Sequence, residues 1–149
     1  MPANTSPIFT LVPNVGTTAV TAANTNAAGT GTVATDIFKA FTAGANGSFV
    51  TRARFSLVAT VASTASTATV ARLFYSTITS GATTGGTNTW LLFELALPTF
   101  TADSPTAPLT PIEVMLNFAM PTGSFLHITN HAAPAANTSW HCVVLGGDY

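Results

Sequence analysis

The clearest feature of the chain is an alternation of apolar and polar side chains with a period of two residues. In residues 49–61 the odd positions, which include Phe55 and Leu57, form one face, and the even positions, which include Arg52 and Arg54, form the other. Successive side chains of a β-strand point to opposite faces of the sheet. The pattern therefore predicts a strand with one face on a hydrophobic core.

Other segments repeat this pattern or share its composition. In residues 112–118 the even positions are Ile, Val, Leu and Phe and the odd positions are Glu, Met and Asn, which predicts a second half-buried strand. Thr, Val, Phe and Ile are frequent elsewhere and favour pleated, half-buried surfaces. The other candidate strands are Val33–Phe41, Thr67–Ser76, Thr89–Leu97, Ser124–Thr129, Ser139–Leu145 and the shorter Ile8–Val12.

Turn-forming residues separate these segments. Residues 43–47 end in an Asn-Gly pair, which favours tight hairpins, and residues 80–88 are rich in Gly and Thr. Residues 99–111 contain three prolines, which exclude a central strand, and 121–123 form a compact turn. About eight short strands with this spacing predict an all-β chain with a single β-sandwich, which we expect to be jelly-roll-like. The pattern by itself does not distinguish a jelly roll from another β-sandwich topology.

The first 32 residues of the chain differ in kind from the rest. Residues 17–32 are almost entirely Thr, Ala, Asn and Gly, and Val20 is the only large apolar residue among them. We therefore expect residues 1–32 to form an extended N-terminal arm and residues 33–149 to form the β-sandwich domain. Two arrangements of the arm remain open: it lies across a neighbouring subunit, or it folds back as an edge strand of its own sheet.

The charge content limits the classes of partner. Charged residues make up 6% of the chain, against about 25% in a typical soluble domain. The formal net charge is −1, and the only basic residues are Lys39, Arg52, Arg54 and Arg72, which is too few for a nucleic-acid-binding face. A neutral surface of this kind is typical of a protein that works inside an assembly.

Neither a membrane segment nor a leader is expected. No run of about 18 apolar residues is present, and Met1–Ser6 lacks the basic and apolar regions of a secretory signal. We therefore expect no membrane partner, and synthesis in a cytoplasm.

Two motifs could suggest a cofactor or a metal, and we expect neither. Gly29–Ala34 matches the G-x-G-x-x-A dinucleotide pattern, but a polar coil precedes it and a β-rich segment follows, so the match is due to chance. Zinc accepts His and Cys ligands, but the spacing of His127, His131, His141 and Cys142 fits no standard site. The last two are adjacent, so on a strand they point to opposite faces.

Carboxylates and aromatic rings are the remaining candidates. A glycosidase needs a pair of carboxylates, but the sequence offers no recognisable pair and we expect no catalytic residue. Glu94 lies in an apolar segment, where a charge needs a partner, and Arg72 on a neighbouring strand is the expected one. Exposed rings could stack on sugars, but we expect Trp90 and Trp140 to fill the core. The carboxylates are Asp36, Glu94, Asp103, Glu113 and Asp148, and the other rings considered are Tyr75 and Tyr149.

Four stretches of the chain resemble a group of small tailed-phage and prophage proteins. They are Ala23–Asn26, Gly29–Thr32, Phe41–Ser48 and the ending Val143–Tyr149. The resemblance covers both ends of the chain, while the middle matches only in character, and it carries no catalytic motif. It implies a virion structural protein with a β-sandwich fold.

From this resemblance and the neutral surface we expect a non-enzymatic capsid decoration (cement) protein. It would bridge subunits of the major capsid protein and stabilise the head shell, with the arm, about Pro2 to Thr32, as the contact element. Proteins of this class are often trimers, so a homo-oligomer on the capsid surface of the virion is expected. The alternative is a tail-associated or fibre module that binds a receptor or glycan. A non-viral extracellular adhesion domain is a third possibility.

Overall fold

The computed structural model describes residues 10–79, 82–102 and 109–149, and these contain twelve β-strands and no helix. The all-β prediction is therefore confirmed for the described residues. The strands are β1 (Val12–Val20), β2 (Gly31–Thr32), β3 (Phe38–Thr42), β4 (Ser48–Ala59), β5 (Thr64–Ala65), β6 (Thr69–Ser76), β7 (Ala82–Thr83), β8 (Thr89–Leu97), β9 (Thr101–Ala102), β10 (Ile112–Met120), β11 (Phe125–Asn130) and β12 (Thr138–Asp148).

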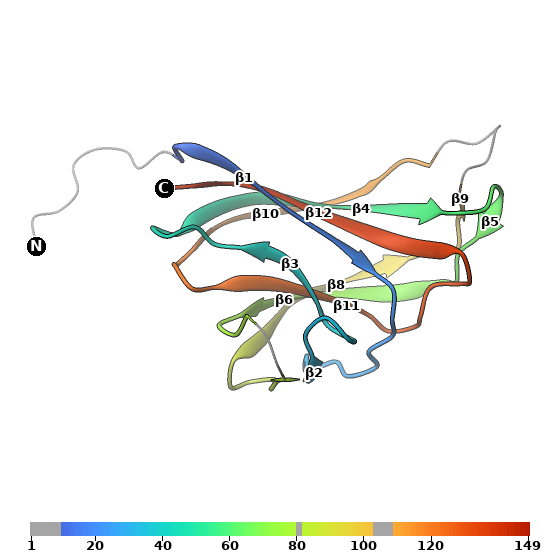
Figure 1. Cartoon of the computed structure of the whole chain (residues 1–149), viewed down its shortest axis with the longest axis horizontal. Helices are drawn as coiled ribbons and strands as arrows, with labels where there is room; N and C mark the ends of the chain where they lie inside the picture. Colours follow the sequence, from blue (N-terminus) through green and yellow to red (C-terminus); the bar gives the residue numbers. More distant parts are fainter. Residues whose placement is uncertain (1–9, 80–81, 103–108) are drawn as a thin grey trace, which may run out of the picture.

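Two four-stranded antiparallel sheets lie one above the other (Figure 1). The strand order is β1-β12-β4-β10 in one sheet, called sheet A, and β3-β11-β6-β8 in the other, called sheet B. One buried cluster includes Phe55 and Trp140 of sheet A together with Phe41, Leu73 and Leu126 of sheet B. The two sheets therefore share one core, as in a sandwich. Two short pairs, β2 with β7 and β5 with β9, lie outside the main sheets.

The eight long strands pair in a nested order. β1 pairs with β12, β3 with β11, β4 with β10 and β6 with β8, so that the first strand pairs with the last and the two middle strands pair with each other. β12 also pairs with β4, and β11 with β6, which completes the two sheets. All of these pairings are antiparallel. The chain thus runs as one long folded hairpin whose two halves are wound into two layers.

The sandwich is closed on one side, where the edge strands β1 and β3 meet. The backbones of Gly16 and Ala40 approach so closely that a Cβ atom on Gly16 would lie 2.0 Å from the carbonyl oxygen of Ala40. The Asn14 side-chain amide donates a hydrogen bond to the carbonyl of Thr42 at 3.0 Å. We call this line of contact the β1–β3 seam. On the opposite side, β8 and β10 are not paired with each other in either sheet, and no backbone hydrogen bond joins them among the described residues.

Residues 12–20 adopt the second of the two arrangements considered for the N-terminal segment. They form β1, an edge strand of the chain's own sheet, with nine register pairs from Val12–Asp148 to Val20–Trp140. The physical reason is backbone pairing along the free edge of β12, which needs few apolar side chains. Pro13 is compatible with this position because an edge strand tolerates a residue without an N–H. The part of the expected arm that precedes Thr10, with the first two residues of the candidate strand Ile8–Val12, lies outside the described residues, and Val12 begins β1.

The regular alternation expected for residues 49–61 is interrupted by a bulge. Val50 and Ala53 are both buried, while Thr51 and Arg52 between them are exposed. The register with β12 shows the extra residue on β4: Leu145 pairs with Arg52 and the next residue of β12 pairs with Val50. The register with β10 also shifts at this place, between Met115 and Phe118. The extra residue reverses the alternation, so the expected faces are wrong before residue 53 and hold from there to the end of β4 at Ala59. Val61, which was expected on the core face, lies beyond β4 and is exposed.

Other strands match the expected positions with small differences at their ends. β8 has the predicted bounds, and β10 keeps the predicted alternation of half-buried and exposed positions. The candidate strand Val33–Phe41 begins only at Phe38, because residues 33–37 form a tight turn. In that turn Ala34 has a φ of 69° and its N–H donates to the carbonyl of Ile37.

Candidate functional site

The open side of the sandwich forms an apolar groove between the two free strand edges. β8 is the last strand of sheet B and β10 is the last strand of sheet A. The space between them has a volume of about 300 Å³. It is lined by Leu92 and Phe93 of β8 and by Val114, Met115, Leu116 and Phe118 of β10. We call this groove and its rim the β8–β10 edge.

The rim of the β8–β10 edge exposes an unusual row of large apolar side chains. Trp90 is 42% exposed, Leu91 43%, Leu92 40% and Met115 63%. A bulge in β8 contributes to this, because the pairing with β6 shifts between Leu73 and its neighbour and leaves an extra residue on β8. Contiguous exposed apolar side chains on a soluble protein commonly mark an interaction surface, whereas single ones need no explanation.

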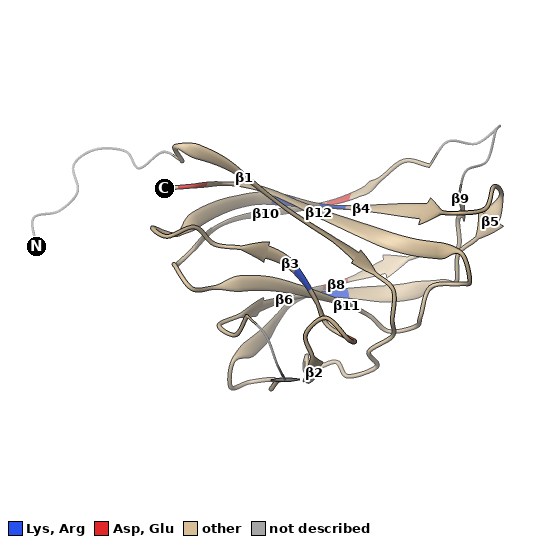
Figure 2. Ribbon diagram, viewed as in Figure 1, with Lys and Arg blue, Asp and Glu red and all other residues tan. Residues whose placement is uncertain are grey.

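The charges along the β8–β10 edge are already neutralised within the chain. Glu113 of β10 contacts Arg54 at 3.1 Å and Arg52 at 3.4 Å, and Glu94 of β8 contacts Arg72 at 2.7 Å. Figure 2 shows how little charge is present elsewhere on the ribbon. Free strand edges are usually protected by Lys, Pro or inward-pointing charges. Neither β8 nor β10 contains Lys or Pro, so this edge is suited to being covered by another protein surface.

The pairing of Arg72 with Glu94, expected from the sequence, is confirmed. The two residues are direct register partners on β6 and β8, and the guanidinium Nε donates to the carboxylate. Arg72 is buried, and its other nitrogens approach the carbonyl of Asn24 at 3.4 Å and Nδ1 of His131 at 3.2 Å. It therefore ties the edge strand β8 to the segment that follows β1, which is a structural role.

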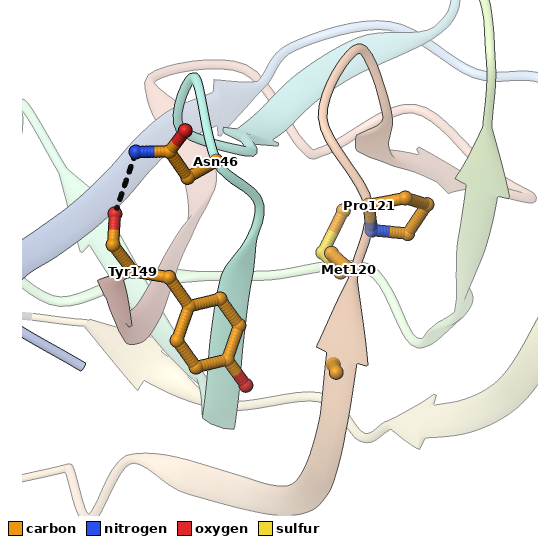
Figure 3. Close-up of a pocket in the computed structure, with 5 residues that line it drawn as sticks. Asn46, Met120, Pro121 and Tyr149 are labelled. Atoms are coloured by element: carbon orange, nitrogen blue, oxygen red, sulfur yellow. Dashed lines mark hydrogen bonds between the residues drawn. The ribbon is translucent and has the colours of Figure 1, made fainter. Parts of the chain in front are cut away.

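A second cavity, of about 510 Å³, lies at the end of the sandwich near the turn from β10 to β11. Figure 3 shows the ring of Tyr149 facing Met120 and Pro121, with Asn46 at one side. The Asn46 amide donates to the carbonyl of Tyr149 at 3.3 Å, so its donor is in use. Ala119 completes the lining. The cavity offers apolar contacts and one amide, without the several convergent polar groups typical of a small-molecule site.

Asp148, next to this cavity, holds three strand ends together. Its carboxylate accepts hydrogen bonds from the Ser48 hydroxyl and from the Asn14 side-chain amide, the latter at 2.8 Å. These two bonds, with the backbone of Gly44, hold the pKa of the carboxyl below its usual value. The charge of Asp148 is thus used to join β12 to β4 and β1.

The histidines and the cysteine occupy separate places. His127 is fully buried on β11, His131 lies beside Arg72, and His141 is half-buried on β12. Cys142 is buried in the core, and burial raises the pKa of its thiol to about 12. Within residues 10–79, 82–102 and 109–149, no group of three or more His, Cys, Asp or Glu could hold a metal ion.

The remaining candidates have structural surroundings. Residues 29–34 form β2 and the start of a turn, and Gly29 packs against the ring of Phe74. The Asp36 carboxylate accepts a hydrogen bond from the Thr32 N–H at 2.7 Å. Asp103 lies outside the described residues.

The expectation for the two tryptophans is half right. Trp140 is buried in the core beside Phe100, with ring centroids 6.1 Å apart. Trp90 is not in the core: it is partly exposed on the β8–β10 edge, with its ring 5.9 Å from that of Tyr75. The apolar pattern around Trp90 does not determine this exposure, because which strands are free edges depends on the order of strands in the sheet.

Comparisons of the chain with protein-family models, with curated proteins and with solved structures found no match. In the part of the chain that the structure describes, no helix is long and apolar enough to cross a membrane. The surface of the chain itself is therefore the basis for proposing a function.

Proposed function

We propose that this protein is a bacteriophage virion structural protein that decorates the capsid. In this proposal it has no catalytic role and no cofactor. It binds the major capsid protein on the outside of the head, bridges neighbouring capsid subunits and stabilises the shell. It is made in the bacterial cytoplasm and joins the assembling virion there.

The observation that carries the proposal is the β8–β10 edge. It combines exposed Trp90, Leu92 and Met115 with carboxylates that are already paired. A second protein surface that covers this edge would bury apolar area, worth roughly 25 cal/mol per Å², without having to desolvate an unpaired charge. The edge, rather than the arm expected from the sequence, is thus our candidate for the contact with the capsid.

The strand pairing supports a jelly-roll topology for the sandwich. Eight strands in two sheets, with the first paired to the last and each further pair nested inside, are what winding a long hairpin into two layers produces. Jelly rolls occur in viral capsid proteins and also in lectins, so the topology is compatible with a virion role without specifying it.

We further propose that the protein works as a homo-oligomer, with a trimer as the first expectation. A contact that joins different surfaces of neighbouring copies closes into a ring when the rotation permits. The low charge content favours such association, because little electrostatic repulsion opposes it.

The proposal predicts where on the virion, and through which side chains, the protein binds. Labelling and copy-number measurement on purified particles should place hundreds of copies on the head. Leu92→Glu and Met115→Glu should each reduce binding to heads that lack the protein by at least tenfold, because a carboxylate on the rim must be desolvated on docking. Binding is measured by co-sedimentation with such heads.

Val15→Glu is the matched control for these substitutions. Val15 is 54% exposed on β1, the opposite edge of sheet A, so the change adds the same charge to another apolar surface. Unchanged binding by this variant supports the β8–β10 edge as the contact. If Val15→Glu abolishes binding while the rim variants bind normally, the contact lies on the N-terminal side of the sandwich. A low copy number confined to the tail would overturn the decoration proposal.

One observation favours the alternative of a tail-associated module that binds glycans. Trp90 is exposed and stands beside Tyr75, and exposed rings can stack on the apolar faces of sugars. A glycan-array signal that is lost in Trp90→Ala, with the thermal unfolding temperature unchanged, would favour this alternative.

A further inference from the structure

His127 is a buried imidazole without a hydrogen-bond partner. Its side chain is 0% exposed, and neither ring nitrogen finds a partner among the described residues. On β11 it stands opposite Lys39 of β3 on one side and Phe74 of β6 on the other. The ring of Phe125 stacks near it, at a centroid distance of 6.3 Å and an interplanar angle of 21°. In this apolar setting a neutral imidazole costs less free energy than a charged one, which would bury an unpaired charge and two N–H donors without an acceptor.

The strand beside His127 is short and irregularly paired. β3 is an edge strand of five residues, and its register with β11 shifts between Leu126 and His127, which leaves Ala40 as an extra residue. Ala40 is also the residue whose carbonyl lies against Gly16 in the β1–β3 seam. The bulge, the seam and the unpartnered imidazole therefore meet at one place in the fold.

We propose that His127 makes the β1–β3 seam sensitive to acid: protonation of its imidazole releases β3 from β11 and opens the closed side of the sandwich. The N–H groups of the protonated ring have no acceptor among the packed side chains, so the ring must reach water. The strand that can move to let water in is β3, because it is short and bulged. This inference is independent of the proposed function.

Charged and titratable side chains lie near His127 on both neighbouring strands and in the turn before β3. Lys39 faces it from β3, and its ammonium lies 5.7 Å from the centre of the Phe125 ring. Arg72 on β6 stands opposite Thr129, the next residue on the same face of β11, and His131 lies beside Arg72. Asp36, in the turn before β3, is engaged with the Thr32 N–H.

These surroundings set the pH range of the effect. Burial first, and the charge of Lys39 second, lower the pKa of His127 from 6.5 to about 4. Between these two values the unfolded or opened chain binds more protons than the closed one, so stability falls as the pH falls. From pH 7 to 4.5 this titration should raise the opening equilibrium constant roughly 50-fold.

The test is amide hydrogen exchange of the full chain at pH 7 and 4.5, after correction for intrinsic exchange rates. Between pH 7 and 4.5, the wild-type protein should lose amide protection in β3 first, while β6 stays protected. In His127→Gln the loss of protection in β3 should be at least five times smaller. His141→Gln, a half-buried histidine on the other sheet, should behave as wild type. His127→Phe provides a second non-titrating variant if the glutamine variant does not fold. Equal losses in wild type and both His127 variants, or equal losses in β3 and β6, would overturn the proposal.

Discussion

A chain that begins at Thr21, and so lacks β1, is expected not to fold. β1 pairs with β12 along nine residues and closes the β1–β3 seam, and Val20 is fully buried. Each lost backbone hydrogen bond costs about 1 kcal/mol, and total stability is only about 5–15 kcal/mol. Far-UV circular dichroism and thermal unfolding should show no cooperative transition for this chain.

A chain that begins at Thr10 is the control, because it retains every strand and seam contact described above. It should unfold cooperatively, within a few degrees of the full chain. The expected division into an arm of residues 1–32 and a sandwich domain of residues 33–149 would instead leave the sandwich folded without β1. If the chain from Thr21 does unfold cooperatively, the strand β1 is dispensable and that expectation is restored.

The strands that pack one face on the core could be predicted from the sequence, whereas β1 could not. β10 shows apolar residues at alternating positions and β8 is a nearly continuous apolar run, and the structure places strands at both. β1 contains Pro13, Gly16 and two threonines, and few of its side chains contribute to the core. Its position depends on backbone pairing with β12, to which hydrophobic periodicity does not respond.

The bulges were equally invisible in the sequence. A period of two residues predicts an uninterrupted strand, but the extra residue at Thr51 depends on how β4 fits β10 and β12 at the same time. The same limit applies to the β8–β10 edge. The apolar segment around Leu92 was recognised as a strand, but its exposure follows from β8 being the last strand of sheet B, and strand order is a property of the whole chain.

The ion pair between Arg72 and Glu94 could be predicted because a charge in an apolar strand needs a partner, a requirement that the local sequence already shows.

Loss of this ion pair should have a large effect on stability. Glu94→Leu should destabilise the protein by about 3 kcal/mol, because it leaves the Arg72 cation buried without its counter-ion. Only 8% of the Arg72 side chain is exposed, against 48% of Glu94, so the loss of stability comes mainly from the unpaired, buried Arg72 cation. Urea unfolding at pH 7 measures the change in free energy.

Glu113→Leu is the matched control, since it makes the same substitution on the other free edge strand. The partners of Glu113, Arg52 and Arg54, have side chains 45% and 48% exposed, so water solvates them once the carboxylate is gone. The expected cost is below about 1 kcal/mol. Adding Arg72→Met to Glu94→Leu should recover part of the lost stability, because the unpaired charge is removed as well. If both single glutamate variants cost the same, burial of Arg72 does not set the strength of the pair, and the link it makes between β8 and Asn24 contributes no more than a surface contact.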